Sequence, residues 1–426
     1  MLTILNSNIS LAHQFIGLSP SISALSQSEA ITSTAQGTDC LFYNPATLPV
    51  QRPHLSILGV EGNTDRDSIS RVEDYQSGES AVISGEDFAL EEFYKKLNSD
   101  KPIRLSTTAR VLDLVLPYFS LSSIGSVRAS SARNIDSYTM KTEADIGAIG
   151  GVGFSIWRFS FGLARYGLLR VGVESSPSTA QFNAIDTAIK DKTFTPQLLP
   201  FREFTSFQYG GLNGTNAGLL FRFLPDNQSG IGLAVLNAGS AKSSRKAPID
   251  REDFRQLENE LFNEAQSHSL ELTVPADIPQ IINLGTNLAY GNPEEPFFAQ
   301  IAIDYHDING DYIQNKLAIA SEVALILTDK AALASAWPVY SRDNLVYHMG
   351  LLGLRGFFSI RPSSYLSYGI GMSFHFGTQM KISLLKLDVD AFELKTLESD
   401  NSIDTTQINE LDLLGLSAKL ALTLIF

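Results

Sequence analysis

Hydrophobic and polar residues alternate with a period of two along much of the chain. In residues 414–426 every even-numbered position is apolar, whereas the odd-numbered positions are mostly small or polar. The same alternation recurs in residues 297–306 and 365–377. Successive side chains of a β-strand point to opposite faces, so this period predicts strands rather than helices.

The predicted strands are long and have two unlike faces. Most of them are about 9–13 residues in length, whereas strands of soluble proteins average about 5–6. One face is apolar and the other is rich in Gly, Ser and Asn, which is typical of a membrane-spanning strand of about 9–11 residues. The predicted strands are residues 55–62, 111–120, 146–156, 158–166, 215–224, 231–238, 282–290, 297–306, 316–327, 345–358, 365–377, 381–394 and 414–426.

These strands predict an all-β protein, a transmembrane antiparallel β-barrel. Each unpaired backbone group costs several kcal/mol in hydrocarbon, so a sheet that crosses a membrane has to close on itself. Aromatic pairs at the strand ends, such as Phe297 and Tyr305, suit the interfacial girdles of such barrels. A large soluble β-sandwich or propeller also alternates and is the alternative, although its strands are shorter.

The remaining segments predict inserts and an N-terminal plug. Residues 84–100 and 248–269 have the spacing of amphipathic helices, the second with Asp250 as N-cap. Residues 176–211 are rich in turn formers and predict a loop at a barrel mouth. Residues 1–54 lack alternation yet are apolar, so we expect a plug or hatch of residues 1–54 and a barrel of residues 55–426.

The composition of the chain limits which kinds of partner are expected. The net charge is −14, and an acidic chain repels phosphate backbones, so nucleic acid is not an expected partner. The most apolar longer stretch, residues 317–327, is too short for a membrane-spanning helix. No basic residue precedes Arg52, and no export signal is visible in the sequence. The single cysteine, Cys40, permits no intrachain disulfide.

The sequence contains no catalytic or metal-binding constellation, so we expect no enzyme and no cofactor. None of the six histidines has a metal-ligand spacing. His306 lies between Asp304 and Asp307, where a lumen or loop residue is expected rather than a base. The glycines of residues 147–155 do not lead into a basic residue as in a phosphate-binding loop; they predict a bulge or a closely packed barrel interior.

The stretch "CLFYNPATLPV", residues 40–50, predicts a short rigid turn. Asn44 can cap a helix whose first residue is Pro45, a position that requires no amide hydrogen. Leu48 precedes Pro49, which disfavours further helix, so the helix is expected to last about one turn. Phe42, Tyr43 and Leu48 are expected to pack this turn against the barrel wall.

Residues 39–48, "DCLFYNPATL", resemble the Asn-Pro-Ala (NPA) motif of the long-chain fatty-acid transporter (FadL) superfamily. Residues 230–239, 278–291, 297–307 and 348–374 are similar to strands of its PorV-like and TraF-like branches. The resemblance implies about 14 antiparallel strands in the bacterial outer membrane and an N-terminal hatch. It also implies passive transport of hydrophobic small molecules such as long-chain fatty acids, which leave sideways into the membrane. The alternative is a PorV-like barrel that binds or shuttles secreted or envelope proteins.

The resemblance also implies site residues and partners. The expected hatch residues are Phe42, Tyr43, Asn44, Pro45, Ala46 and Leu48. The expected signal of the C-terminal strand for the barrel-assembly machinery consists of Leu422, Leu424 and Phe426. The other expected partners are outer-membrane lipid, a hydrophobic ligand and, in the alternative, exported proteins.

Overall fold

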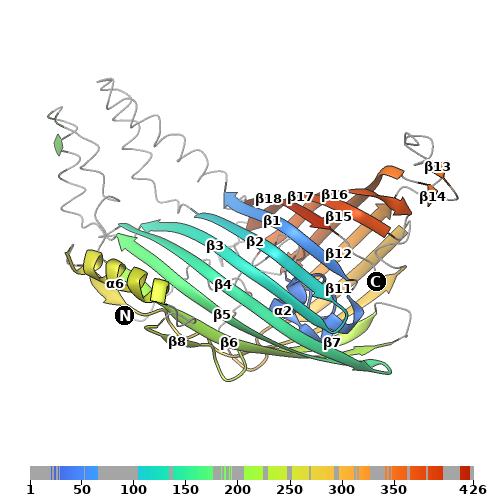
Figure 1. Ribbon diagram of the computed structural model, residues 1–426, viewed down its shortest axis with the longest axis horizontal. Helices are drawn as coiled ribbons and strands as arrows, with labels where there is room; N and C mark the ends of the chain where they lie inside the picture. Colours follow the sequence, from blue (N-terminus) through green and yellow to red (C-terminus); the bar gives the residue numbers. More distant parts are fainter. Residues whose placement is uncertain are drawn as a thin grey trace, which may run out of the picture.

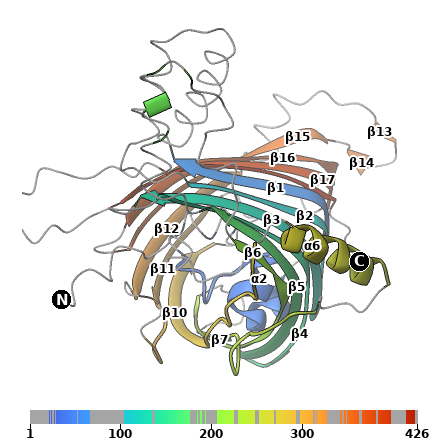
Figure 2. The ribbon, with the colours of Figure 1, turned by 90° about the vertical axis from the view of Figure 1, so that its left-hand side faces the viewer.

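Fourteen antiparallel strands form a closed ring in the computed structural model (Figures 1 and 2). The ring follows chain order and closes because β1 pairs with β18. Its strands are β1 (His54–Asp65), β2 (Arg104–Leu116), β3 (Phe119–Arg133), β4 (Tyr138–Ile156), β5 (Phe159–Ser175), β6 (Ser206–Arg222), β7 (Gly230–Leu236), β10 (Ile281–Tyr290), β11 (Phe297–Tyr305), β12 (Leu317–Ile326), β15 (His348–Arg361), β16 (Tyr365–Gln379), β17 (Ile382–Thr396) and β18 (Leu413–Leu422).

The structure describes most of this ring and part of the N-terminal segment. The described residues are 21, 24, 27, 29–51, 53–65, 104–133, 138–175, 184, 187–188, 191, 193, 206–223, 229–246, 252–267, 270–291, 297–310, 313, 316–326, 341–342, 345–346, 348–361, 365–379, 382–396 and 413–422. The predicted helix at residues 84–100 lies outside them, as do Leu424 and Phe426, whereas Leu422 ends β18.

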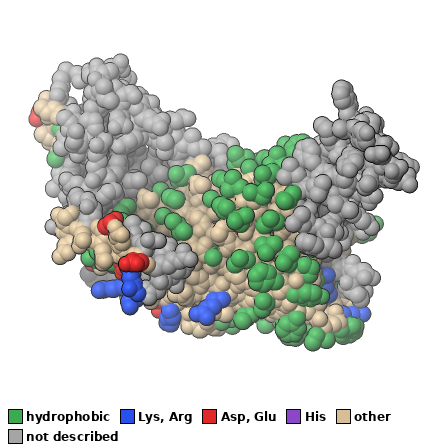
Figure 3. All heavy atoms as spheres, in the orientation of Figure 1, with side chains coloured by type: hydrophobic (Ala, Val, Ile, Leu, Met, Phe, Trp, Pro, Cys, Tyr) green, Lys and Arg blue, Asp and Glu red, His purple; other side chains and the backbone are tan. Residues whose placement is uncertain are grey.

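The alternation seen in the sequence separates the two faces of the wall. In β4, Ile146, Val152 and Ile156 are exposed on the outside, whereas Asp145 and Ile149 are buried on the inside. Figure 3 shows hydrophobic side chains spread over the outer face of the wall, with Lys and Arg along its lower edge in this view. The outside of a closed barrel can be apolar only where lipid surrounds it, so the protein is an outer-membrane β-barrel.

The two ends of the barrel differ. Tight turns join β2 to β3 and β4 to β5 at one end, β16 ends and β17 begins there, and the strand ends at His54 and Leu422 lie there too. The longest connections, such as the one from β1 to β2, lie at the other end. Outer-membrane barrels have short periplasmic turns and longer extracellular loops, so the first end faces the periplasm.

Exposed aromatic side chains mark the periplasmic end. Tyr118, Trp157 and Tyr290 lie in or beside its turns and are 53%, 77% and 73% exposed. The predicted bracketing of β11 is confirmed, because Phe297 and Tyr305 at its two ends both face outward. Amphipathic rings prefer the membrane interface, so these residues form part of the aromatic girdles.

Three sequence predictions of loops and strands were wrong in their bounds. Residues 345–358 are not one strand, because residues 345 and 346 pair with residues 341 and 342 outside the ring. Residues 111–120 are not one strand, because Pro117 and Tyr118 form the turn between β2 and β3; Tyr118 has a φ of 70°. Residues 176–211 are not all loop, because β6 begins at Ser206 and pairs with β5. Pro117 lies in a local turn within one apolar stretch, whereas the start of β6 depends on its pairing with β5, which a local turn propensity does not contain.

The insert between β7 and β10 confirms the predicted second helix. It contains β8 (Lys242–Ser244), α6 (Glu252–Ser267) and β9 (Glu271–Thr273), while β13 (Ser341–Arg342) and β14 (Leu345–Val346) form a separate hairpin. Helix α6 lies outside the barrel in Figure 2 and packs Phe262 against Phe207 and Tyr209 of β6. None of the described helices is long and apolar enough to cross a membrane.

Candidate functional site between the N-terminal segment and the barrel wall

The residues of the predicted turn form two short helices inside the barrel. They are α2 (Asp39–Tyr43) and the 3-10 helix η2 (Pro45–Val50), joined by Asn44; together we call them the NPA segment. Figure 2 shows α2 within the ring of strands. The expected hatch residues Phe42, Tyr43, Asn44, Pro45, Ala46 and Leu48 are all buried.

Asn44 caps η2 as the sequence predicts. Its Oδ1 accepts a hydrogen bond of 3.0 Å from the amide of Ala46, and Pro45 occupies the first helical position. The helix is longer than one turn, however, because it continues through Pro49 to Val50. The amide of Gln51 closes it by donating to the carbonyl of Leu48 at 3.0 Å, so the missing amide hydrogen of Pro49 does not end the helix.

The side chain of Asn44 also joins the NPA segment to the chain that precedes it. Its Nδ2 donates to the carbonyl of Thr32 at 2.7 Å. The amide of Thr32 in turn donates to Oδ2 of Asp304, on the inner face of β11, at 2.7 Å. Asn44 therefore uses both ends of its amide group, and neither end is exposed to water.

Glycines in the wall allow the NPA segment to lie directly on the backbone of the strands. Gly162 in β5 and Gly218 in β6 have no space for a Cβ, because the backbone of Pro45 and the side-chain oxygen of Asn44 occupy it. At Gly232 in β7 a Cβ would be 2.6 Å from the carbonyl oxygen of Thr32. We call Gly162, Gly218 and Gly232 the glycine patch.

The glycines of residues 147–155 extend this contact into β4. A Cβ at Gly151 would be 2.6 Å from Cδ2 of Leu41, and one at Gly153 would be 2.9 Å from Cδ of Pro49. The predicted closely packed interior is confirmed here. Any larger residue would displace the NPA segment from this side of the lumen.

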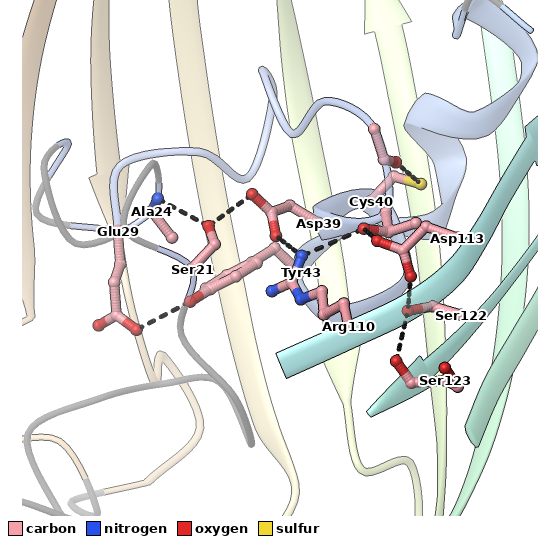
Figure 4. Close-up of polar contacts among 12 residues, drawn as sticks. Ser21, Ala24, Glu29, Asp39, Cys40, Tyr43, Arg110, Asp113, Ser122 and Ser123 are labelled. Carbon is pink, nitrogen blue, oxygen red and sulfur yellow. Dashed lines mark hydrogen bonds and ion pairs between the residues drawn. The ribbon is translucent and has the colours of Figure 1, made fainter. Parts of the chain in front are cut away.

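An ion pair holds the other side of the segment (Figure 4). Nη1 of Arg110 in β2 lies 2.9 Å from Oδ1 of Asp39 and 3.1 Å from the hydroxyl of Thr38. The Thr38 hydroxyl donates to Asp113 at 3.1 Å, and the hydroxyl of Ser21 donates to Oδ2 of Asp39 at 2.6 Å. We call Thr38, Asp39, Arg110 and Asp113 the Arg110 cluster.

A β-bulge explains why Arg110 and Asp113 both face the lumen. Residues three apart in a regular strand point to opposite faces. In β2 the register against β3 shifts between Val111 and Leu114, and Leu112 has a φ of 58° with its side chain exposed on the outside. The extra residue turns Asp113 inward beside Arg110.

Serine side chains of β3 satisfy the backbone groups that the bulge separates. The amide of Val111 donates to Oγ of Ser123 at 3.2 Å, and the same hydroxyl bonds the carbonyl of Val111. Ser120 donates to the carbonyl of Leu114 at 3.0 Å. Ser120 and Ser123 therefore bond backbone groups on both sides of the bulge.

A third contact binds the carbonyl end of α2. Nδ2 of Asn216 in β6 donates to the carbonyl of Leu41 at 2.9 Å. Oδ1 of Asn216 accepts from the amide of Asn237 at 3.0 Å, and the Tyr166 hydroxyl donates to Asn237 at 2.6 Å. These wall residues satisfy a helix carbonyl that has no partner within so short a helix.

Burial determines the protonation of two groups in the NPA segment. Desolvation raises the pKa of the Cys40 thiol well above its ordinary value, and the nearby carboxylate of Asp39 acts in the same direction. Desolvation, with the carboxylate of Glu29 beside it, also raises the pKa of Tyr43, whose hydroxyl donates to Glu29 at 3.2 Å. Both side chains are therefore uncharged at neutral pH.

The contacts of the site hold the NPA segment against the barrel wall. The described part of the chain has no group of His, Cys, Asp and Glu side chains that could bind a metal ion. His306 is fully buried directly after β11, and the side chain of His375 lies outside the described residues. The groups that meet here position one another through hydrogen bonds, an ion pair and close packing.

The sequence pattern alone did not single out the wall residues of this site. Arg110 and Asp113 stand at positions of opposite parity, so only the bulge reveals that they act together. Gly218 and Gly232 look like the other small residues of lumen-facing positions. The one available signal was the pair of charged residues within an otherwise apolar stretch, residues 109–116.

Among known proteins, the chain is similar to solved structures, at low sequence identity. No protein-family model and no curated protein sequence matches the chain. A crystal structure of a Pseudomonas aeruginosa FadL homologue is 12% identical, covers 96% of this chain and 98% of its own, and has a TM-score of 0.45. The toluene transporter TodX of P. putida is 10% identical, with 94% and 98% covered and a TM-score of 0.39. The Ralstonia pickettii toluene transporter TbuX is 11% identical, with 95% and 97% covered and a TM-score of 0.36.

Proposed function

We propose that the protein is an outer-membrane channel for hydrophobic small molecules and that the NPA segment is its plug. One observation carries this proposal: the segment lies buried inside a closed barrel and is bound to the inner wall from two sides. The Arg110 cluster binds it to β2, and the glycine patch packs against it from β5, β6 and β7.

A plug bound in this way can move without a chemical reaction. Cys40 is the only cysteine, so no intrachain disulfide fixes the segment to the wall. Each neutral hydrogen bond contributes only about 0.5–1.5 kcal/mol net, since water can replace either partner. Displacement of the plug therefore exchanges protein contacts for contacts with water or with a ligand, and passage requires no catalytic residue.

The ligand class follows from the resemblance in the sequence. Long-chain fatty acids are the ligand that it implies, and they are one member of the proposed class. Toluene, for which the TodX and TbuX structures are named, is a chemically simpler probe of the same class. Neither molecule requires a cofactor to cross the barrel.

Uptake by whole cells tests this function. Cells that carry the barrel in their outer membrane are expected to take up radiolabelled fatty acid and toluene faster than cells without it, and to accumulate them chemically unchanged. Equal uptake rates with and without the barrel contradict the proposal. A secreted protein that copurifies with the barrel while uptake stays equal would favour the protein-binding alternative.

The plug role has its own test. Deletion of residues 1–50 is expected to open the lumen, which a planar bilayer detects as a rise in single-barrel conductance. A conductance equal to that of the full chain would mean that the NPA segment does not close the lumen.

A further inference from the structure

Among the residues that the structure describes, carboxylates outnumber basic groups on the inner wall around and outside the plug. Arg110 interacts electrostatically with three carboxylates, those of Asp39, Glu61 and Asp113. One guanidinium cannot neutralise three acids. The Arg110 cluster and Glu61 together are therefore net negative.

A second cluster, on β12, β15 and β17, repeats this imbalance. Arg355 in β15 forms an ion pair with Asp390 in β17 and lies 3.7 Å from Glu322 in β12. It also interacts with Asp388. Lys419 lies opposite Asp388 in the pairing of β17 with β18 and offsets part of this excess.

A third cluster contains more basic groups than acids, but its excess of one positive charge is smaller than the negative excess of the other two clusters. Asp145 is held by Arg128 at 2.6 Å and by Arg170 at 2.7 Å. Lys141 lies 2.8 Å from Glu143, so this cluster has one basic group more than it has acids. The buried carboxylates Glu29 and Asp304, nearer the plug, add further negative charge to the described interior.

The register of the sheet places these charges in a solute's path. One row of directly paired positions runs from β15 to β5 along the inner face. It consists of Arg355, Gly371, Asp390, Ser417, Glu61, Thr108, Ser126, Asp145 and Arg170. Thr108 lies closer to the extracellular end of β2 than Arg110, which binds the plug. A molecule that enters from outside therefore meets this row before it reaches the plug.

We propose that this barrel discriminates by charge and admits uncharged and cationic amphiphiles in preference to anionic ones. A cleft with low-dielectric walls and an excess of one sign of charge focuses its field and repels solutes of that sign. A fatty acid would then pass as the protonated acid rather than as the carboxylate. This inference rests on the proposed function and narrows it.

Three probes with the same dodecyl chain separate charge from hydrophobicity. They are the alcohol, the sulfonate and the trimethylammonium salt, each supplied below its micellar concentration to cells with and without the barrel. After subtraction of the barrel-free rate, sulfonate uptake is expected to be slower than alcohol uptake by about tenfold or more. Equal uptake of the sulfonate and the alcohol overturns the inference. Uptake of none of the three contradicts the proposed function instead.

A matched pair of variants assigns the effect to the lumen. Glu61→Gln combined with Asp388→Asn removes two lumenal carboxylates and is expected to raise the ratio of sulfonate to alcohol uptake severalfold. Glu393→Gln is the control, because Glu393 bonds the hydroxyl of Tyr368, whose side chain is exposed on the outer face. An unchanged ratio in the lumenal variant, or an equal rise in the control, overturns the inference. Heat-modified gel mobility confirms that each barrel is folded.

Discussion

The side-chain oxygen of Asn44 occupies the space that a Cβ at Gly218 would require. The same oxygen caps η2, so the wall glycine and the start of the plug helix depend on each other. A methyl group at position 218 has to move Asn44, and Asn44 cannot move without losing its bond to the amide of Ala46.

We therefore expect Gly218→Ala to loosen the plug. Overpacking of this kind costs about 1–3 kcal/mol, which corresponds to an increase in opening of about fivefold to a hundredfold. The rate at which a small thiol reagent labels Cys40 measures this opening. Cys40 is the only cysteine of the chain and is fully buried, so labelling requires the plug to open.

Gly62→Ala in β1 is the matched control, since a Cβ there meets nothing within 4 Å. Its labelling rate should equal that of the parent chain. Equal rates in both alanine variants would show that the glycine patch does not support the plug.

Removal of the Arg110 guanidinium should open the plug more than removal of the Asp39 charge. In Arg110→Gln the carboxylates of Asp39, Glu61 and Asp113 lose their common partner. Breaking a buried pair in this way costs about 3–5 kcal/mol. In Asp39→Asn, Arg110 keeps Glu61 and Asp113.

Labelling of Cys40 in both single variants and the double variant measures this asymmetry. Arg110→Gln is expected to accelerate labelling by about a hundredfold or more, and the double variant should be less open than the sum of the single effects predicts. Strict additivity would contradict a direct coupling between the two side chains.

Two substitutions separate the cap that Asn44 provides from its hydrogen bond to Thr32. Asn44→Asp keeps the acceptor for the amide of Ala46 but removes the donor to the carbonyl of Thr32. Asn44→Ala removes both. The loss of an N-cap costs about 0.5–2 kcal/mol, and an unsatisfied buried group costs about 1–3 kcal/mol more.

Both variants should label faster at Cys40 than the parent chain, with Asn44→Ala faster than Asn44→Asp if the cap dominates. The reverse order would mean that the aspartate charge, buried without a cation in contact, costs more than the lost cap. Thr47→Val is a neighbouring control, because its hydroxyl bonds only the Asn44 carbonyl among the contacts described for it.

Alkaline pH should weaken the plug through Cys40. Burial raises the pKa of its thiol above the ordinary value, so the closed state keeps a proton that the open state loses. The stabilising effect is therefore complete below about pH 9 and decreases as the pH rises from there towards the raised pKa. The loss is about 1.4 kcal/mol per pH unit within that window.

Conductance between pH 8 and pH 10 tests this expectation in the parent chain and in Cys40→Ala. The parent should open progressively across the window, whereas the alanine variant should lack this component. The phenol of Tyr43, whose pKa is also raised, acts at higher pH because its ordinary value is 10.0. An identical pH response of the two proteins would exclude Cys40 as the cause.

The sequence by itself determined the architecture of the wall. The period-two pattern in segments such as β11 (Phe297–Tyr305) distinguishes an outer apolar face from an inner one, because successive side chains of a regular strand point to opposite faces. Local rules also predicted the Asn44 cap and the helix α6. The role of the NPA segment as a plug remains a proposal on this fold.

Only the tertiary structure decided which wall residues meet the plug. Arg110 and Asp113 share the lumenal face because one residue of β2 is extra relative to β3, and Gly218 contacts Asn44 because of a register set between distant strands. Parity is a local property of the chain, whereas a bulge and a register follow from pairing with other segments. For that reason the barrel could be predicted from the pattern, and the contacts that hold its N-terminal segment could not.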